Sequence, residues 1–364
     1  MIIDIHGHLS PPEAAERFPM PPSLTDVDGM LAARAQAGID LTIIGSPVGA
    51  GAMARVPGVD NYAQPRDRLR AFHSWMSGLI AAHPDQLRGY VYANPFGDDD
   101  HLEGVRETLA DPAFVGLITN SSVHGEQLGS PRADSFFALA AELGVPVMVH
   151  PPAEPAGTEQ VEDPRFVEMI GRFGDVTTGL AMIAFAGWLE KYPELRLIGA
   201  TGGGALALLP ERLAAAARPR EGHSRGGAPV AGGRAAGGSG PPRGTGRAAP
   251  ERPAREGAPR PGGGTPAAGG GRPTAPPPAA AATDPVAALR RMYVDTSTFS
   301  AAHLRLNAEV LGPERMLFGT DSPPLTAPLE DLLRTIEKLP IDAAAQQLVL
   351  GGNAEALFDL RSRP

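Results

Sequence analysis

Short apolar runs alternate along the chain with stretches that have helical spacing. The pattern predicts strands at Ile2–Leu9, Leu41–Ser46, Leu87–Ala93, Val115–Asn120, Val145–His150, Leu195–Ala200, Met292–Thr296 and Met316–Thr320. It predicts helices at Asp28–Gly38, Arg66–His83, Ser135–Gly144 and Leu329–Leu339. Strands that alternate with helices form a parallel sheet, so this pattern predicts an α/β fold, a (β/α)8 TIM barrel. A doubly wound sheet is the alternative, but no G-x-G-x-x-G motif follows the first strand.

One segment departs from this pattern. From Ala217 to Thr283 nearly every residue is Gly, Ala, Pro or Arg, and Val230 is the only aliphatic residue larger than alanine. Such a stretch buries too little apolar surface to offset its ordering entropy. We therefore divide the chain into a first barrel part (1–216, strands one to six), a low-complexity insertion (217–283) and the rest of the barrel (284–364). The insertion is interpreted as a disordered linker, a basic arm for a polyanion, or a segment from a shifted reading frame.

Composition narrows the function. The chain has 364 residues, 42% of them hydrophobic, a formal charge of −9 and no cysteine. The negative charge argues against a nucleic-acid or membrane-surface partner. Without cysteine, any metal site must use histidine and carboxylate ligands. No apolar run reaches the ~18 residues of a membrane span, and no signal peptide precedes the first strand, so we expect a cytoplasmic protein.

Polar residues that suit a metal site follow the predicted strands. His6 and His8 end the first strand, and residues two apart on a strand point the same way. Neutral imidazole is a common metal ligand. The other polar residues at strand ends are Ser46, Asn94, Asn120, Ser121, His150, Thr201, Asp295, Thr296 and Asp321. In a barrel of this kind the carboxyl ends of the strands carry the active site, so the histidines and aspartates of this set are expected to converge.

Several motifs resemble the amidohydrolase superfamily, in particular amidohydrolase family 2, which contains aminocarboxymuconate semialdehyde decarboxylase. The motifs occur in family order and cover the chain from Met1 to about Arg212 and from Pro285 to Leu360. They are IDIHGHL (Ile3–Leu9), GVPVMVHP (Gly144–Pro151), KYPEL (Lys191–Leu195), TGGG (Thr201–Gly204), MYVDT (Met292–Thr296), FGTDSP (Phe318–Pro323) and GNAEALF (Gly352–Phe358). The resemblance implies an amidohydrolase-type barrel interrupted by the insertion between strands six and seven.

The resemblance also implies a metal-dependent enzyme. His6, His8, His150 and Asp321 would hold one divalent metal ion, zinc or manganese. The implied activity is nonoxidative decarboxylation of a small unsaturated or aromatic carboxylic acid. Hydrolysis of a cyclic ester or amide, with a lactone as one possible substrate, is the alternative, and a degenerate, non-catalytic barrel is the second. Similar enzymes are often dimers, so a homodimer is a further expectation.

Thr201 departs from the family pattern. Similar decarboxylases carry a histidine there as an acid–base group, and a threonine hydroxyl cannot accept a proton near neutral pH. Thr201, Asp321 and His124, on the loop after strand four, are therefore the catalytic candidates. Arg55, on the loop after strand two, and Asn94 are the candidate substrate-binding residues, and Arg66 is another arginine that could pair with a substrate carboxylate.

Overall fold

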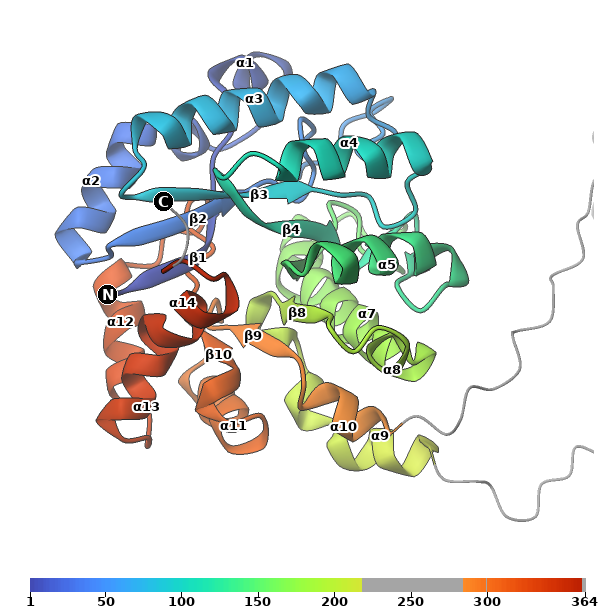
Figure 1. The fold of residues 1–364 in the computed structure, drawn as a ribbon, viewed down its shortest axis with the longest axis vertical. Helices are drawn as coiled ribbons and strands as arrows, with labels where there is room; N and C mark the ends of the chain where they lie inside the picture. The colour runs from blue at the N-terminus through green and yellow to red at the C-terminus, as the bar shows by residue number, and fades with distance from the viewer. Residues whose placement is uncertain (218–283, 299, 362–364) are drawn as a thin grey trace, which may run out of the picture. The chain divides into compact units, whose positions relative to one another are not determined.

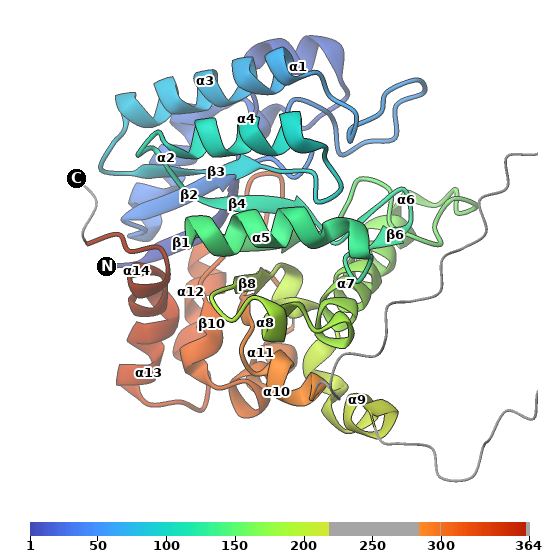
Figure 2. The same cartoon turned by 45° about the vertical axis from the view of Figure 1, so that its right-hand side comes forward.

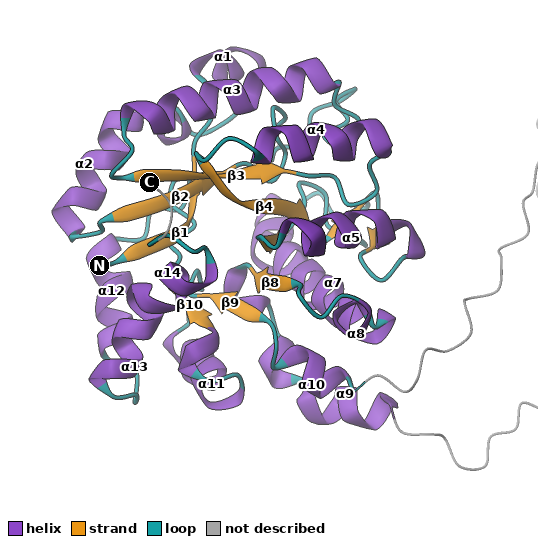
Figure 3. Cartoon of the chain, in the orientation of Figure 1, coloured by secondary structure: helices purple, strands orange, loops and turns teal. Residues whose placement is uncertain are grey.

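The computed structural model describes residues 1–217, 284–298 and 300–361, and these contain eight parallel strands ringed by helices (Figures 1 and 3). The strands are β1 (Ile3–His8), β2 (Leu41–Gly45), β3 (Leu87–Tyr92), β4 (Phe114–Asn120), β7 (Pro146–His150), β8 (Arg196–Gly199), β9 (Tyr293–Asp295) and β10 (Met316–Leu317). They pair in this order, each with its neighbour. The predicted α/β barrel is confirmed.

The two ends of the sheet meet through backbone hydrogen bonds. The amide of Ile5 on β1 donates to the carbonyl of Phe318, at 2.9 Å, and the amide of Asp321 donates to the carbonyl of His6, at 2.8 Å. These bonds bring the residues after β10 against β1 and join the first and last strands of the ring. The carboxyl ends of all eight strands consequently face one rim of the barrel.

Helices cover the outside of the strands, as both views of the ribbon show (Figures 1 and 2). They are α1 (Pro12–Arg17), α2 (Val27–Ala37), α3 (Arg66–Ala82), α4 (Asp99–Leu109), α5 (Asp134–Leu143), α6 (Pro164–Phe166), α7 (Arg172–Ala186), α8 (Trp188–Lys191), α9 (Pro210–Ala217), α10 (Pro285–Leu289), α11 (Ala301–Val310), α12 (Leu329–Glu337), α13 (Ala343–Gln347) and α14 (Asn353–Leu357). A π-helical turn, η3 (Val167–Gly171), joins α6 to α7. A small hairpin, β5 (Ser122–Val123) and β6 (Glu126–Gln127), follows β4.

The four predicted helices are present as α2, α3, α5 and α12, with bounds that agree within two residues. Local chemistry explains where α2 begins and ends. The side chain of Asp26 accepts from the amide of Gly29 at 3.0 Å and caps its first turn. Gly38 ends it with φ +76°, a left-handed conformation that glycine adopts without a steric penalty.

The last strand is shorter than predicted. The pattern predicts a strand from Met316 to Thr320, but β10 ends at Leu317. Beyond it, the amide of Gly319 donates to Thr296 Oγ1 at 3.1 Å, and the amide of Thr320 donates to Asp4 Oδ1 at 3.0 Å. Side chains of neighbouring strands therefore take the place of ladder partners here, and this irregular backbone leads directly into Asp321.

Two apolar clusters hold the barrel together. One lies between the strands and the surrounding helices. The other includes strand residues such as Ile5, Ile43 and Tyr90, with Phe358 after α14 packed against Tyr90 at 5.8 Å between ring centroids. Gly7 allows β1 and β2 to approach closely, since a Cβ atom there would lie 2.7 Å from Thr42 Cγ2.

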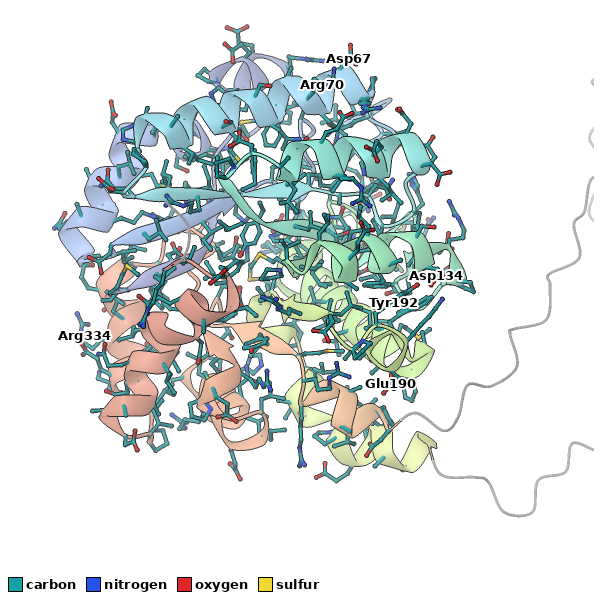
Figure 4. The ribbon with its side chains drawn as sticks, in the orientation of Figure 1. Asp67, Arg70, Asp134, Glu190, Tyr192 and Arg334 are labelled. Atoms are coloured by element: carbon teal, nitrogen blue, oxygen red, sulfur yellow. The ribbon has the colours of Figure 1, made fainter. Side chains whose placement is uncertain are left out.

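Polar contacts brace the outer helices. Figure 4 shows Asp134 of α5 and Tyr192, which follows α8, on neighbouring elements, and Tyr192 Oη donates to Asp134 Oδ1 at 2.7 Å. The indole of Trp188 stacks on Tyr192 and donates to the carbonyl of Leu128 at 2.8 Å. Trp188 therefore packs between helices, away from the strand ends.

The insertion expected at 217–283 lies, from residue 218 onward, outside the described residues. No helix in the described parts of the chain is both long and apolar enough to cross a lipid bilayer.

Candidate metal centre and its cavity

Four side chains from three strand ends converge at the rim of the barrel. They are His6 and His8 of β1, His150 at the end of β7, and Asp321 after β10, and each offers one ligand atom within 4.8 Å of the others. The three imidazole centroids lie 4.9 to 5.1 Å apart. Asp321 Oδ1 lies 3.0 Å from His8 Nε2 and 3.5 Å from His6 Nε2. The structure thus brings together the four predicted metal ligands.

Hydrogen bonds to Nδ1 orient each imidazole. His6 Nδ1 lies 2.6 Å from Asp295 Oδ2, His8 Nδ1 lies 2.9 Å from the carbonyl of Gly45, and His150 Nδ1 lies 2.8 Å from the carbonyl of Pro151. All three partners are acceptors, so in the neutral imidazoles Nδ1 carries the proton and Nε2 presents a lone pair. This is the arrangement of histidines that bind a metal through Nε2.

The donor set fits a divalent metal ion. Nε2 of His6 and Nε2 of His150 are buried and have no hydrogen-bond partner among the described residues. Buried polar atoms without a partner are uncommon and call for an explanation. Three imidazole nitrogens with one carboxylate oxygen are a donor set that would suit zinc or manganese.

Burial and the neighbouring charges shift the pKa values of His6, His150 and Asp321 in this cluster. Burial opposes the charged form of His6, but Asp321 and the hydrogen bond to Asp295 raise its pKa to about 9. Burial, together with the charges of His6 and His8, holds the pKa of His150 well below its usual range. Burial would raise the pKa of Asp321, but the neighbouring histidines lower it below its usual range. Asp321 is therefore a carboxylate at neutral pH.

A second set of buried groups positions the ligands. Asp295 is fully buried and accepts from the amide of Gly202 at 2.7 Å and from Ser297 Oγ at 2.6 Å, besides its contact with His6. Asp4 accepts from the amide of His6 at 3.1 Å and from Arg34 Nη2 at 3.0 Å. Asp295 was recognised in the sequence as a strand-end aspartate, but its role appears only in the structure.

Three of the four ligand candidates, His8, His150 and Asp321, line a cavity of about 380 Å³ at the carboxyl ends of the strands. Its polar lining includes His8, Ser46, His150, Glu168, Arg172, Thr201, Ser297 and Asp321. Its apolar lining includes Met20, Leu24, Val48, Met53, Met169 and Leu325. A second cavity, of about 420 Å³, lies between α2 and residues 322–330 and is lined by none of the four metal-ligand candidates.

Thr201 lines the cavity beside the candidate metal ligands, as expected from its strand end. Its φ is +52°, which is unusual for a β-branched residue, and its Oγ1 donates to the carbonyl of Ala200 at 2.7 Å. Its amide donates to Ser297 Oγ at 3.3 Å. The hydroxyl can orient a neighbouring group but, near neutral pH, cannot accept a proton.

The other sequence candidates lie elsewhere, since none of them lines the cavity within the described residues. His124 is 62% exposed and its Nε2 lies 3.3 Å from Asp60 Oδ2. Arg55 donates to the carbonyl of Thr158 at 3.1 Å and lies 3.4 Å from Glu154. Asn94 Nδ2 donates to the carbonyl of Tyr62 at 2.9 Å.

Arg66 pairs with Glu107 of α4 at 2.8 Å, on the outer helix layer. The lining residues that the sequence analysis did not single out include Ser297, Glu168 and Arg172. Ser297 follows the strand-end pair Asp295 and Thr296, so its position could have been read from that pattern. Glu168 and Arg172 belong to a helical stretch 18 and 22 residues after His150, and no local signal in the sequence marks them.

A sequence comparison identifies a family and a curated relative. A family model described as amidohydrolase matches residues 3–244 and 262–360. The chain is 21% identical over 165 residues to 2-amino-3-carboxymuconate-6-semialdehyde decarboxylase of Dictyostelium discoideum. That alignment covers 44% of this chain and 46% of the relative, so the match spans about half the length of the relative.

Solved structures share the fold over nearly the whole chain. The 5-carboxyvanillate decarboxylase of Sphingomonas paucimobilis superposes with a TM-score of 0.69 at 19% identity, covering 98% of each chain. A dihydroxybenzoic acid decarboxylase from Polaromonas, solved with bound manganese and the inhibitor 2-nitroresorcinol, gives a TM-score of 0.68 at 16% identity and covers 99% of this chain and 97% of its own. These likenesses confirm the predicted amidohydrolase-type barrel.

Proposed function

Because the chain belongs to the amidohydrolase family of enzymes, we propose that it is a nonoxidative decarboxylase of a small aromatic or unsaturated carboxylic acid. His6, His8, His150 and Asp321 would hold one divalent ion, zinc or manganese. The observation that carries this proposal is the convergence of four buried or part-buried nitrogen and oxygen donors, two of them unpartnered, at a cavity with a largely apolar wall. The relatives named as decarboxylases support it.

The chemistry needs a site that stabilises negative charge. When the carboxylate leaves as carbon dioxide, its bonding electron pair stays on the substrate carbon, which then takes up a proton. A divalent metal bound here would supply positive charge that stabilises this developing charge. Asp295, Gly45 and Pro151 hold the three imidazoles in the tautomer that leaves Nε2 free. The apolar wall formed by residues such as Val48 and Met169 limits water around the reacting carbon.

We assign the proton transfer to Asp321, which is a carboxylate at neutral pH and would therefore take up a proton from solvent and pass it to the substrate carbon as carbon dioxide leaves. Among the described residues, the carboxyl groups that line the cavity are those of Asp321 and Glu168. Glu168 is paired with Arg172, whereas Asp321 lies within the ligand cluster. His124 is the less suitable candidate, because its side chain is mostly exposed and contacts Asp60. Thr201 would orient the substrate through its hydroxyl.

Metal analysis and product analysis test the proposal together. We expect about one zinc or manganese ion per chain in the purified protein, lost in His6→Ala and Asp321→Asn. With aromatic acids as substrates, the loaded protein should release carbon dioxide. Ring opening of lactones or cyclic amides without carbon dioxide release would favour the hydrolase. A folded protein that takes up neither ion would overturn the metal-dependent assignment and favour a degenerate barrel.

A further inference from the structure

Arg172 is the one arginine or lysine side chain that lines the cavity beside the candidate metal ligands within the described part of the chain. It is the first residue of α7, and only 13% of its side chain is exposed. The residues just before it form the π-helical turn η3, from which Glu168 and Met169 also line the cavity. Single π-helical turns occur frequently at functional sites.

Two elements hold the guanidinium of Arg172 in place. Its Nη2 donates to the carbonyl of Met53, on the loop after β2, at 3.0 Å. Its Nη1 donates to Glu168 Oε2, and its Nε is buried without a partner among the described residues. A guanidinium has five N–H donors in a fixed plane, so these contacts leave donors unused. Burial lowers the pKa of Arg172, and an arginine nevertheless stays charged at neutral pH.

We propose that Arg172 binds a second carboxylate of the substrate, one that is retained when the carboxylate at the metal end is lost. The preferred substrates would then be dicarboxylic acids rather than monocarboxylic acids. A planar, partly desolvated guanidinium is the side chain best suited to a carboxylate, which it can bind through two parallel hydrogen bonds. This inference rests on the proposed function in one respect, since it assumes that the carboxylate to be lost lies beside His6, His8, His150 and Asp321.

Without substrate, the Glu168 carboxylate forms an ion pair with the Arg172 guanidinium, and a substrate carboxylate would displace it. The Glu168 side chain is 46% exposed, so its ion pair with Arg172 is a weak one and its carboxylate returns readily to water. A substrate carboxylate enclosed by the cavity gains more from the same guanidinium than Glu168 does. Glu168 therefore competes with the second carboxylate, and removing its charge is expected to strengthen binding.

Calorimetric titration of the manganese-loaded protein with two probes tests this inference. The probes are benzoate and isophthalate, which differ by one carboxylate. We expect isophthalate to bind at least about tenfold more tightly than benzoate. Arg172→Gln should reduce this preference to about one and leave benzoate affinity and manganese content unchanged, and Arg172→Lys should keep part of it. Glu168→Gln should increase isophthalate affinity ~threefold.

A nearby arginine provides the control. Arg165 is 87% exposed and pairs with Asp163, so Arg165→Gln should leave both affinities unchanged. Equal loss of both probes in Arg172→Gln would indicate that Arg172 only shapes the cavity, and a wild-type protein without preference would also overturn the inference. The two proposals fail separately. If isophthalate binding depends on Arg172 but no acid releases carbon dioxide, only the decarboxylase assignment is contradicted. If carbon dioxide release is unchanged in Arg172→Gln, only the role of Arg172 is contradicted.

Discussion

Replacing Asp295 with asparagine tests whether Asp295 orients His6, one of the proposed metal ligands, for metal binding. Asp295 is fully buried and its Oδ2 lies 2.6 Å from His6 Nδ1. Its Oδ1 accepts from the amides of Gly202 at 2.7 Å and Ser297 at 3.2 Å. An asparagine that keeps its oxygen towards these two amides must turn its NH₂ group towards His6.

The tautomer of His6 determines the size of the effect. With an NH₂ group opposite, His6 can keep a hydrogen bond only by accepting at Nδ1, which moves the ring proton to Nε2. Nε2 then has no lone pair for a metal. Replacing an outer partner of a metal-bound histidine typically lowers metal affinity about 10- to 100-fold. We expect Asp295→Asn to weaken zinc binding by this factor, which corresponds to about 1.4 to 2.7 kcal/mol.

Competition with a chromophoric zinc chelator at pH 7.5 measures the affinity, with circular dichroism to verify the fold. Asp175→Asn is the matched control. Asp175 is also buried and accepts from Ser121 Oγ at 2.5 Å, Ser122 Oγ at 2.8 Å and the amide of Ala156 at 2.7 Å, but it contacts no metal ligand. Both variants should be less stable, and only Asp295→Asn should bind zinc more weakly. A folded Asp295→Asn protein with wild-type zinc affinity would refute this reasoning.

Three further predictions concern protonation and buried charge. Because the pKa of His6 is raised to about 9, the metal-free protein carries a proton on His6 at neutral pH, and metal binding should release it. Metal affinity should therefore rise with pH up to about 9. Calorimetry in buffers of different ionisation enthalpy measures the proton release. Arg34→Met leaves the buried carboxylate of Asp4 without its cation and should lower the free energy of unfolding, measured in urea, by about 3 to 5 kcal/mol; a loss below ~1 kcal/mol would contradict it. His73, whose pKa burial lowers to about 3, accepts from the amide of Tyr92 at 3.1 Å. Its neutral form stabilises the fold fully above pH 6.5, so stability should fall as pH drops from 6.5 towards 3, with a smaller fall in His73→Gln.

The order of strands and helices could be predicted from the sequence because hydrophobic periodicity is a local property. The predicted strand Ile2–Leu9 became β1, and the helix predicted at Ser135–Gly144 became α5, which ends at Gly144 with φ +61°. The metal-ligand candidates could also be found, because parallel strands bring their carboxyl ends to one rim. His8 and His150 are the last residues of β1 and β7, and His6 lies two residues before the end of β1 on the same face.

Contacts between distant segments could not be read from the sequence. The alternation predicted a strand to Thr320, but side chains of Asp4 and Thr296 take the hydrogen bonds of its last residues. Arg172 lies in a helical stretch with nothing local to distinguish it from an exposed arginine such as Arg165. In the structure its guanidinium donates to the carbonyl of Met53, which lies more than a hundred residues earlier in the chain.

The sequence by itself therefore determined the barrel and the residues at its strand ends, since each depends on the spacing of side chains within one segment. Only the tertiary structure decided which of those residues meet, which tautomer each histidine holds and which charged side chain lines the cavity. Hydrogen bonding and burial depend on atoms that approach from other strands and loops. The contact between His6 and Asp295, from the first and seventh strands of the ring, is the clearest case.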